Sequence, residues 1–159
     1  MSDQASTEIS YGPLAFGDPE EVEWAARIHE SAPLNWDPDY EVTDLRVGNW
    51  VKFLGEAAND PKVHVSVARL GPRLVGLHWL VMAEKHGVSC AHIQSLWVDP
   101  QQRSRGIGKA LKDRGEAWAK SRGAKFVWTE VFYANQRMID YNLRLGFSAG
   151  QVEMTKALT

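Results

Sequence analysis

The stretch that decides the fold is LWVDPQQRSRGIGK, residues 96–109. Its first residues end an alternating apolar segment typical of a β-strand, and Pro100 stops that strand. The turn that follows carries the cations Arg103, Arg105 and Lys109 and two glycines, and an apolar helical pattern comes next. Exposed N–H groups at a helix N-terminus favour an anion, and glycine lets a ligand approach the backbone. The stretch therefore predicts an anion-binding turn between a strand and a helix.

The periodicity of the remaining chain predicts a mixed α/β (α+β) fold. Helical spacing predicts one helix from Asp18 to Pro33 and others over 45–58, 106–121 and 136–145. Alternation predicts strands over residues 9–16, 63–69, 74–84, 89–98, 125–132 and 147–158. Residues 34–41 have turn chemistry without a period and predict a loop. We expect a mostly antiparallel sheet with helices on both faces, and a parallel strand after the third helix.

Length and charge restrict the function classes. With 159 residues, of which 44% are hydrophobic, the chain has the size of one domain over 9–159 after a disordered N-terminus over 1–8. A formal net charge of −2 removes the general attraction to nucleic acid. The sequence lacks a membrane-length apolar run and a signal-peptide layout, so we expect no membrane partner and a cytoplasmic location. One cysteine, Cys90, excludes a multi-cysteine metal cluster, and the histidines show no metal spacing.

Several motifs in order resemble the GNAT superfamily of N-acetyltransferases. Residues 92–100 are similar to its fourth strand, and Arg103-x-x-Gly106-x-Gly108 fits its pyrophosphate loop. Asn135 followed by Leu145-Gly146-Phe147 fits its last helix. Residues 17–20 are similar to its usual beginning. The resemblance covers nearly the whole chain and implies a GNAT-like fold and acetyl transfer from acetyl-CoA.

The resemblance also implies where acetyl-CoA binds. The pantetheine arm lies where the strands at Leu96 and Val131 splay apart. The backbone N–H groups of Leu96 and Val98 then bond this arm and polarise the thioester carbonyl, as an oxyanion hole does. The expected cofactor-binding residues are Leu96, Trp97, Val98, Arg103, Ser104, Arg105, Gly106, Ile107, Gly108, Lys109, Asn135 and Asn142. Asn135 is equally suited to cap the last helix.

A base is required because an amine must lose a proton when it attacks. His92 is the first choice, since the resemblance places it where some family members carry a catalytic Glu or His. Glu130 on the neighbouring strand is the second choice, and Gln94 points to the same face as His92. The family's usual acid, a tyrosine five residues before the Phe of Gly-Phe, is replaced here by Asn142, which cannot supply a proton.

The acceptor amine is predicted from the loop around residue 36. Carboxylates and aromatic rings alternate there, a mixture that suits a small cationic amine. The residues expected to bind the substrate are Trp36, Asp37, Asp39, Tyr40 and Gln94. The sequence leaves open a non-catalytic acyl-CoA-binding or sensing domain and an enzyme that acts on a protein or peptide amine. A homodimer is also open, whereas a nucleic-acid-binding module is disfavoured by the acidic total.

Overall fold

The structure is a computed structural model that describes residues 8–157. Residues 1–7, most of the segment predicted to be disordered, lie outside the described residues. The sheet has the strand order β1-β2-β3-β4-β5, antiparallel except for the parallel pair β4–β5. Its strands are β1 (Ile9–Pro13), β2 (Val63–Leu70), β3 (Arg73–Lys85), β4 (Val88–Val98) and β5 (Val127–Trp128).

The helices occupy most of the segments predicted to be helical. They are α1 (Pro19–Glu30), α2 (Asp44–Ala57), α3 (Ile107–Ser121) and α4 (Gln136–Arg144), with short 3-10 turns η1 (Ala32–Asn35) and η2 (Pro100–Gln102). The turn η1 occupies part of the predicted loop 34–41. Within residues 8–157, no helix combines the length and the apolar character needed to cross a membrane.

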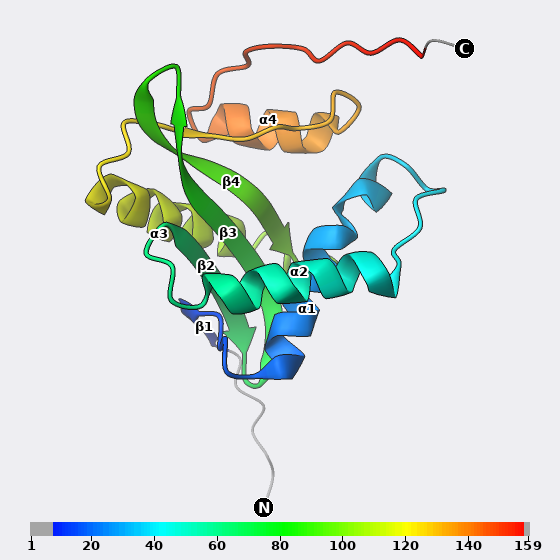
Figure 1. Cartoon of the computed structure of the whole chain (residues 1–159), viewed down its shortest axis with the longest axis vertical. Helices are drawn as coiled ribbons and strands as arrows, with labels where there is room; N and C mark the ends of the chain where they lie inside the picture. Colours follow the sequence, from blue (N-terminus) through cyan, green and yellow to red (C-terminus); the bar gives the residue numbers. More distant parts are fainter. Residues whose placement is uncertain (1–7, 158–159) are drawn as a thin grey trace, which may run out of the picture.

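Helices cover both faces of the sheet, as predicted (Figure 1). On one face, α1 and α2 pack against β2 and β3 in a core that contains Leu54 and Trp79. On the other face, α3 packs through Ile107 and Leu111. A Cβ at Gly76 of β3 would lie 2.9 Å from Leu111 Cδ1, so glycine is what lets α3 sit this close to the sheet.

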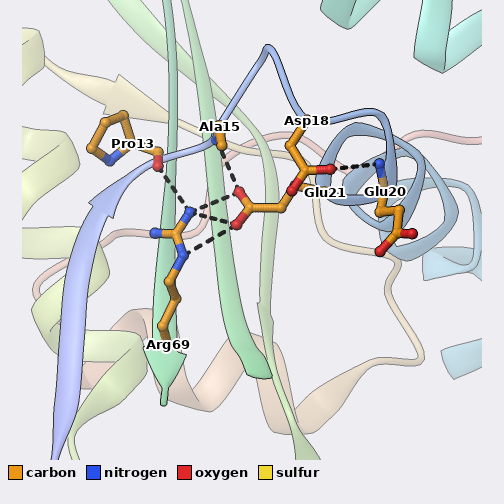
Figure 2. Close-up of polar contacts among 6 residues, drawn as sticks. All are labelled: Pro13, Ala15, Asp18, Glu20, Glu21 and Arg69. Carbon is orange, nitrogen blue, oxygen red and sulfur yellow. Dashed lines mark hydrogen bonds and ion pairs between the residues drawn. The ribbon is translucent and has the colours of Figure 1, made fainter. Parts of the chain in front are cut away.

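An ion pair fixes the junction between β1 and α1 (Figure 2). Arg69 of β2 donates from Nη2 to both carboxylate oxygens of Glu21, at 2.9 and 2.7 Å, and also to the carbonyl of Pro13. The same carboxylate accepts from the N–H of Ala15, while Asp18 caps α1 by accepting from the N–H of Glu20. Because a bidentate arginine–carboxylate pair is geometrically specific, it holds the first helix in place beside the sheet.

The strand β5 is much shorter than the predicted strand over 125–132. It pairs with β4 only at Ala91–Val127 and His92–Trp128. The register of β3 with β4 shifts between Trp79 and Leu80, and Gln94 is the residue of β4 left without a partner. Such a bulge bends a strand and increases its twist. The parallel strands therefore separate directly after their first contacts.

The predicted terminal strand over 147–158 is wrong for the described part of that segment. Residues 147–157 contain no strand and leave the domain as an extended segment (Figure 1). Val152 and Met154 are 75% and 89% exposed. The alternation of these two apolar residues suggested a strand with one apolar face. A strand also needs an adjacent strand to accept its backbone hydrogen bonds, and β5 ends too early to pair with this segment.

Candidate active site

One edge of β4 is unpaired beyond Ile93. The N–H of Asp99 donates to the carbonyl of Val75 in β3 at 2.9 Å. Because N–H groups alternate in direction along a strand, those of Leu96 and Val98 point away from β3. The carbonyl of Val98 also points away from β3, since it accepts from Arg103 Nε at 3.3 Å. No strand within residues 8–157 pairs with this part of the edge.

A cavity of about 160 Å³ opens beside this edge. Its floor is formed by β4, and one wall is the segment that leaves β5, whose Thr129 hydroxyl donates to the carbonyl of Ile93. The other walls come from η1 and the loop after it, α3 and α4. The lining side chains that carry polar groups are Asn35, Trp36, Gln94, Ser95, Lys112, Thr129, Glu130, Asn135 and Asn142. Leu96 lines the same cavity, so the unpaired edge and the polar groups share one space.

The predicted anion-binding turn leads directly into α3. Gly106 is the N-cap residue and adopts a left-handed backbone with φ 77°, which favours glycine. Ser104 is also left-handed, with φ 64°. Turns of this kind make concavities lined by N–H groups. The turn therefore has the backbone shape of an anion site, and Ile107 behind it is buried in the core.

The side chains of the turn are only partly available to an anion. Lys109 is paired with Asp113 at 2.6 Å, and Arg105 donates to Gln102. Burial is the largest cause that lowers the pKa of Arg103, and the positive charge of Arg137 in α4 is the second. The two guanidinium groups are therefore close enough to interact. Two guanidinium groups near each other favour an anion between them. Arg137 was missed in the sequence because only the fold brings α4 to the turn.

The need for glycine at position 108 is explained by Tyr141 of α4. A Cβ at this position would lie 2.8 Å from the Tyr141 hydroxyl oxygen. Burial is the main cause that raises the pKa of Tyr141. A side chain at 108 would therefore displace Tyr141 before it reached a ligand, and a test of the turn is better directed at Arg103.

His92 and Glu130, the two alternative candidate bases, lie near each other. The His92 Nε2 is 4.0 Å from a Glu130 carboxylate oxygen, and His92 stacks on Trp128. The Gln94 amide nitrogen lies 2.7 Å from His92 Nδ1 and donates to it. Burial lowers the pKa of His92, partly opposed by Glu130. The residues that reach the cavity wall are Gln94 and Glu130, and His92 stands behind them.

The predicted acceptor loop is only partly at the cavity. Trp36 lines it and stacks on Phe132 with ring centroids 5.2 Å apart, which closes one end. Tyr40 instead donates to buried Glu30 at 2.5 Å. Asp37 and Asp39 are exposed and do not line the cavity, and Asp37 accepts from the N–H of Asp39. The carboxylates of the loop are thus kept away from the wall.

The two candidate asparagines hold different positions. Asn135 caps α4 by accepting from the N–H of Met138, and it also lines the cavity. Asn142 is buried, and its Oδ1 has no hydrogen-bond partner within residues 8–157. A buried polar atom without a partner is unusual in a folded protein and is expected to meet a ligand or a water.

Two further residues were missed in the sequence, one behind the cavity and one that lines it. His29 of α1 contacts the Ser95 hydroxyl at 3.0 Å, and burial lowers its pKa to about 4. Lys112 of α3 is only 2% exposed, and burial lowers its pKa to about 8. The sequence pattern gave Lys112 no role, and its enclosure is visible only once α4 packs beside α3. Among the described residues, no group of His, Cys, Asp and Glu has the arrangement of a metal site.

Known proteins share this fold. An aminoglycoside acetyltransferase from an uncultured soil metagenomic sample, solved in complex with sisomicin, superposes with a TM-score of 0.71. The match covers 95% of this chain and 97% of that one at 19% identity. At this identity the likeness concerns the fold alone.

Two curated relatives match over 75 residues each. An uncharacterized N-acetyltransferase of Methanocaldococcus jannaschii is 39% identical, across 47% of this chain and 32% of that protein. A mycothiol acetyltransferase of Propionibacterium freudenreichii subsp. shermanii is 35% identical, across 47% of this chain and 24% of that protein. The matched part is thus about a third or less of those proteins. Residues 23–147 match the model of the Acetyltransferase (GNAT) family, and the chain belongs to that family.

Proposed function

We propose that this chain is an N-acetyltransferase that moves the acetyl group of acetyl-CoA to a primary amine of a small molecule, by direct attack of the amine. The observation that carries the proposal is the open edge of β4, where the N–H groups of Leu96 and Val98 point away from β3 and meet no strand. Donors fixed in advance at a site of growing negative charge are worth ~3 to 4 kcal/mol each in comparable sites. Membership of the GNAT family supports the reaction class.

The residues present fit acetyl-CoA at three places. The left-handed turn around Gly106 suits a pyrophosphate, with Arg103 and Arg137 beside it. The unpaired edge of β4 suits an extended amide-containing arm, which hydrogen-bonds as an added strand does. The buried Oδ1 of Asn142 has room for a donor. When bound, acetyl-CoA supplies an activated acetyl group.

The base assigned to the reaction is the His92–Glu130 pair. Glu130 is exposed at the cavity wall and can take a proton from the acceptor, while His92 faces it from behind at 4.0 Å. The basic nitrogen of His92 is Nδ1, which already accepts from Gln94. The charges of the two groups interact, so removal of either is expected to change the pH dependence of the other.

A small acceptor is supported by the size of the cavity and by the residues that enclose it. The stacked pair Trp36–Phe132 closes one end, and Glu130 is the carboxylate among the described lining residues. The names of the relatives, mycothiol acetyltransferase and aminoglycoside acetyltransferase, also point to small amines. The acceptor proposed here is therefore a small amine held between Trp36 and Glu130, without a role for Asp37 and Asp39.

The test is an acetylation screen with acetyl-CoA across aminoglycosides, polyamines, amino acids, aromatic amines and peptides, followed by mass spectrometry of the product. Acetylation of a small amine with matching release of CoA is expected. Against the best acceptor, Glu130→Gln and His92→Ala should each lower kcat ~10²-fold or more and change its pH profile. Glu56→Gln, an exposed change on α2, is the matched control. Tight CoA binding without acetylation of any amine would favour a sensing domain instead.

A further inference from the structure

The lysine of α3 that faces the cavity is buried without an opposite charge. Lys112 is 2% exposed, and no carboxylate of residues 8–157 comes within 4.0 Å of its ammonium group. Its ammonium group lies 4.2 Å from the centre of the Phe147 ring. An unpaired buried charge disfavours folding, so lysine at this position suggests a use that an apolar residue could not serve.

The groups around Lys112 leave its charge uncompensated. Glu116, one turn further along α3, raises its pKa, but burial outweighs this effect and lowers the pKa to about 8. His78 of β3 faces Lys112 from the sheet, and burial, followed by the charge of Lys112, keeps the pKa of His78 down at about 3. His78 is therefore neutral and contributes no charge of either sign to the ammonium group at neutral pH.

The side chain of Lys112 lies on the path from the anion-binding turn to the open edge of β4. It is one helical turn beyond Gly108, and it lines the cavity together with Leu96 and Asn142. Asn142 places its unpartnered Oδ1 in the same buried region. A thioester that runs from the turn to the N–H groups of Leu96 and Val98 must pass this wall.

We propose that Lys112 is the proton donor to the sulfur atom that leaves in the reaction. This inference rests on the proposed function. The amine nitrogen bonds to the acetyl carbon, the carbon–sulfur bond breaks, and its electron pair goes to sulfur. The sulfur takes a proton from Lys112 Nζ, and the lysine regains one from solvent. The proton lost by the amine goes to the His92–Glu130 pair. Lys112 thereby fills the role that Asn142 cannot.

The test measures the ionisation of bound CoA, which needs no acceptor and no turnover. Calorimetry first establishes CoA binding by the parent, by Lys112→Met and by Lys120→Met, an exposed control on the same helix. Thiolate ultraviolet absorbance is then followed against pH with CoA saturated. A nearby ammonium group favours the thiolate, so the thiol in the parent and in Lys120→Met should ionise about one pH unit or more below free CoA. In Lys112→Met it should return toward free CoA.

Transfer kinetics give a second measurement. With a good acceptor, Lys112→Met should lower kcat ~10- to 100-fold with little change in CoA affinity. The kcat of the parent is expected to fall above about pH 8 as Lys112 deprotonates, and this fall should be absent in Lys112→Met. Identical ionisation of free CoA and CoA bound to the parent would overturn the role of Lys112 and leave the proposed function intact. Failure of the parent to bind CoA would overturn the proposed function itself.

Discussion

The two edges of β4 differ in how far they are hydrogen-bonded to a neighbouring strand. Toward β3, every residue of the strand except Gln94 is paired, from Val88 opposite Lys85 to Val98 opposite Gly76. Toward β5, it pairs at Ala91 and His92 and then opens. The bulge at Gln94 lies at the point where the open part begins. One edge therefore holds the sheet together, while the other keeps hydrogen-bonding groups available.

The contrast between the two edges shows how a strand can keep hydrogen-bonding groups available for a ligand without pairing with other chains. An open edge at the outside of a sheet would attract any other strand. Here the open edge lines a cavity as far as Leu96, with Thr129 and Phe132 on one side and Lys112 on another. A ligand that fills this cavity displaces water from the Leu96 N–H group, which strengthens the interaction of that group with developing charge.

The largest effect is expected from removing one N–H group from the open edge. Replacing Leu96 by its α-hydroxy acid turns the peptide bond into an ester and deletes that N–H. We expect kcat to fall ~10²- to 10³-fold, because an oxyanion donor is lost. The matched change at Trp97 deletes an N–H directed to β3 and should cost ~1 kcal/mol of stability with a much smaller effect on kcat. Equal losses of kcat at the two positions would remove the distinction between the edges.

A smaller effect is expected at the turn that follows the open edge. Arg103→Ala removes a guanidinium group that bonds the carbonyl of Val98 and lies near Arg137. Loss of a charge-assisted hydrogen bond should weaken CoA binding ~10- to 100-fold, by calorimetry at low salt. Lys52→Ala on α2 is the matched control and should bind CoA as the parent does. If both variants bind equally well, the anion site lies elsewhere.

The closed side of the sheet was easier to predict from sequence than the open side. The segments over 63–69, 74–84 and 89–98 were predicted as strands from their local pattern and the turns between them, and the structure contains them. The turn before the third helix was predicted from Gly106 and its neighbours, and the structure contains a turn there with a left-handed Gly106, while anion binding stays a prediction. Local chemistry was sufficient for both.

The features that the sequence could not show depend on where β4 and β5 separate and on contacts between residues far apart in the sequence. The pattern over 125–132 predicted one strand, but the bulge in β4 moves the partner away after Trp128. Asp37 and Asp39 had the composition of a cation site, but their loop turns them to solvent. The sequence did not single out Lys112, and the enclosure of its side chain depends on residues 30 or more positions away, such as Asn142 and Phe147. The sequence carries no local signal for such contacts.

The last effect concerns stability rather than catalysis, at His29 of α1, which contacts Ser95 of β4. Burial lowers the pKa of His29 from 6.5 to about 4, so between these pH values the unfolded chain binds a proton that the folded chain does not. Stability is therefore lost as pH falls through this window, by about 1.4 kcal/mol per pH unit from this residue. His29→Gln can keep the contact with Ser95 and should reduce the slope by that amount in urea unfolding. An unchanged slope would show that His29 is not buried neutral.

The most direct test of the difference between the edges is amide hydrogen exchange with and without acetyl-CoA. Without ligand, the N–H groups of Trp97 and Asp99 should be protected because they bond to β3, and those of Leu96 and Val98 should exchange quickly. Saturating acetyl-CoA should protect Leu96 and Val98 at least ~10-fold and leave Trp97 and Asp99 nearly unchanged. Strong protection of Leu96 and Val98 without ligand, or none with it, would contradict the assignment of this edge to acetyl-CoA.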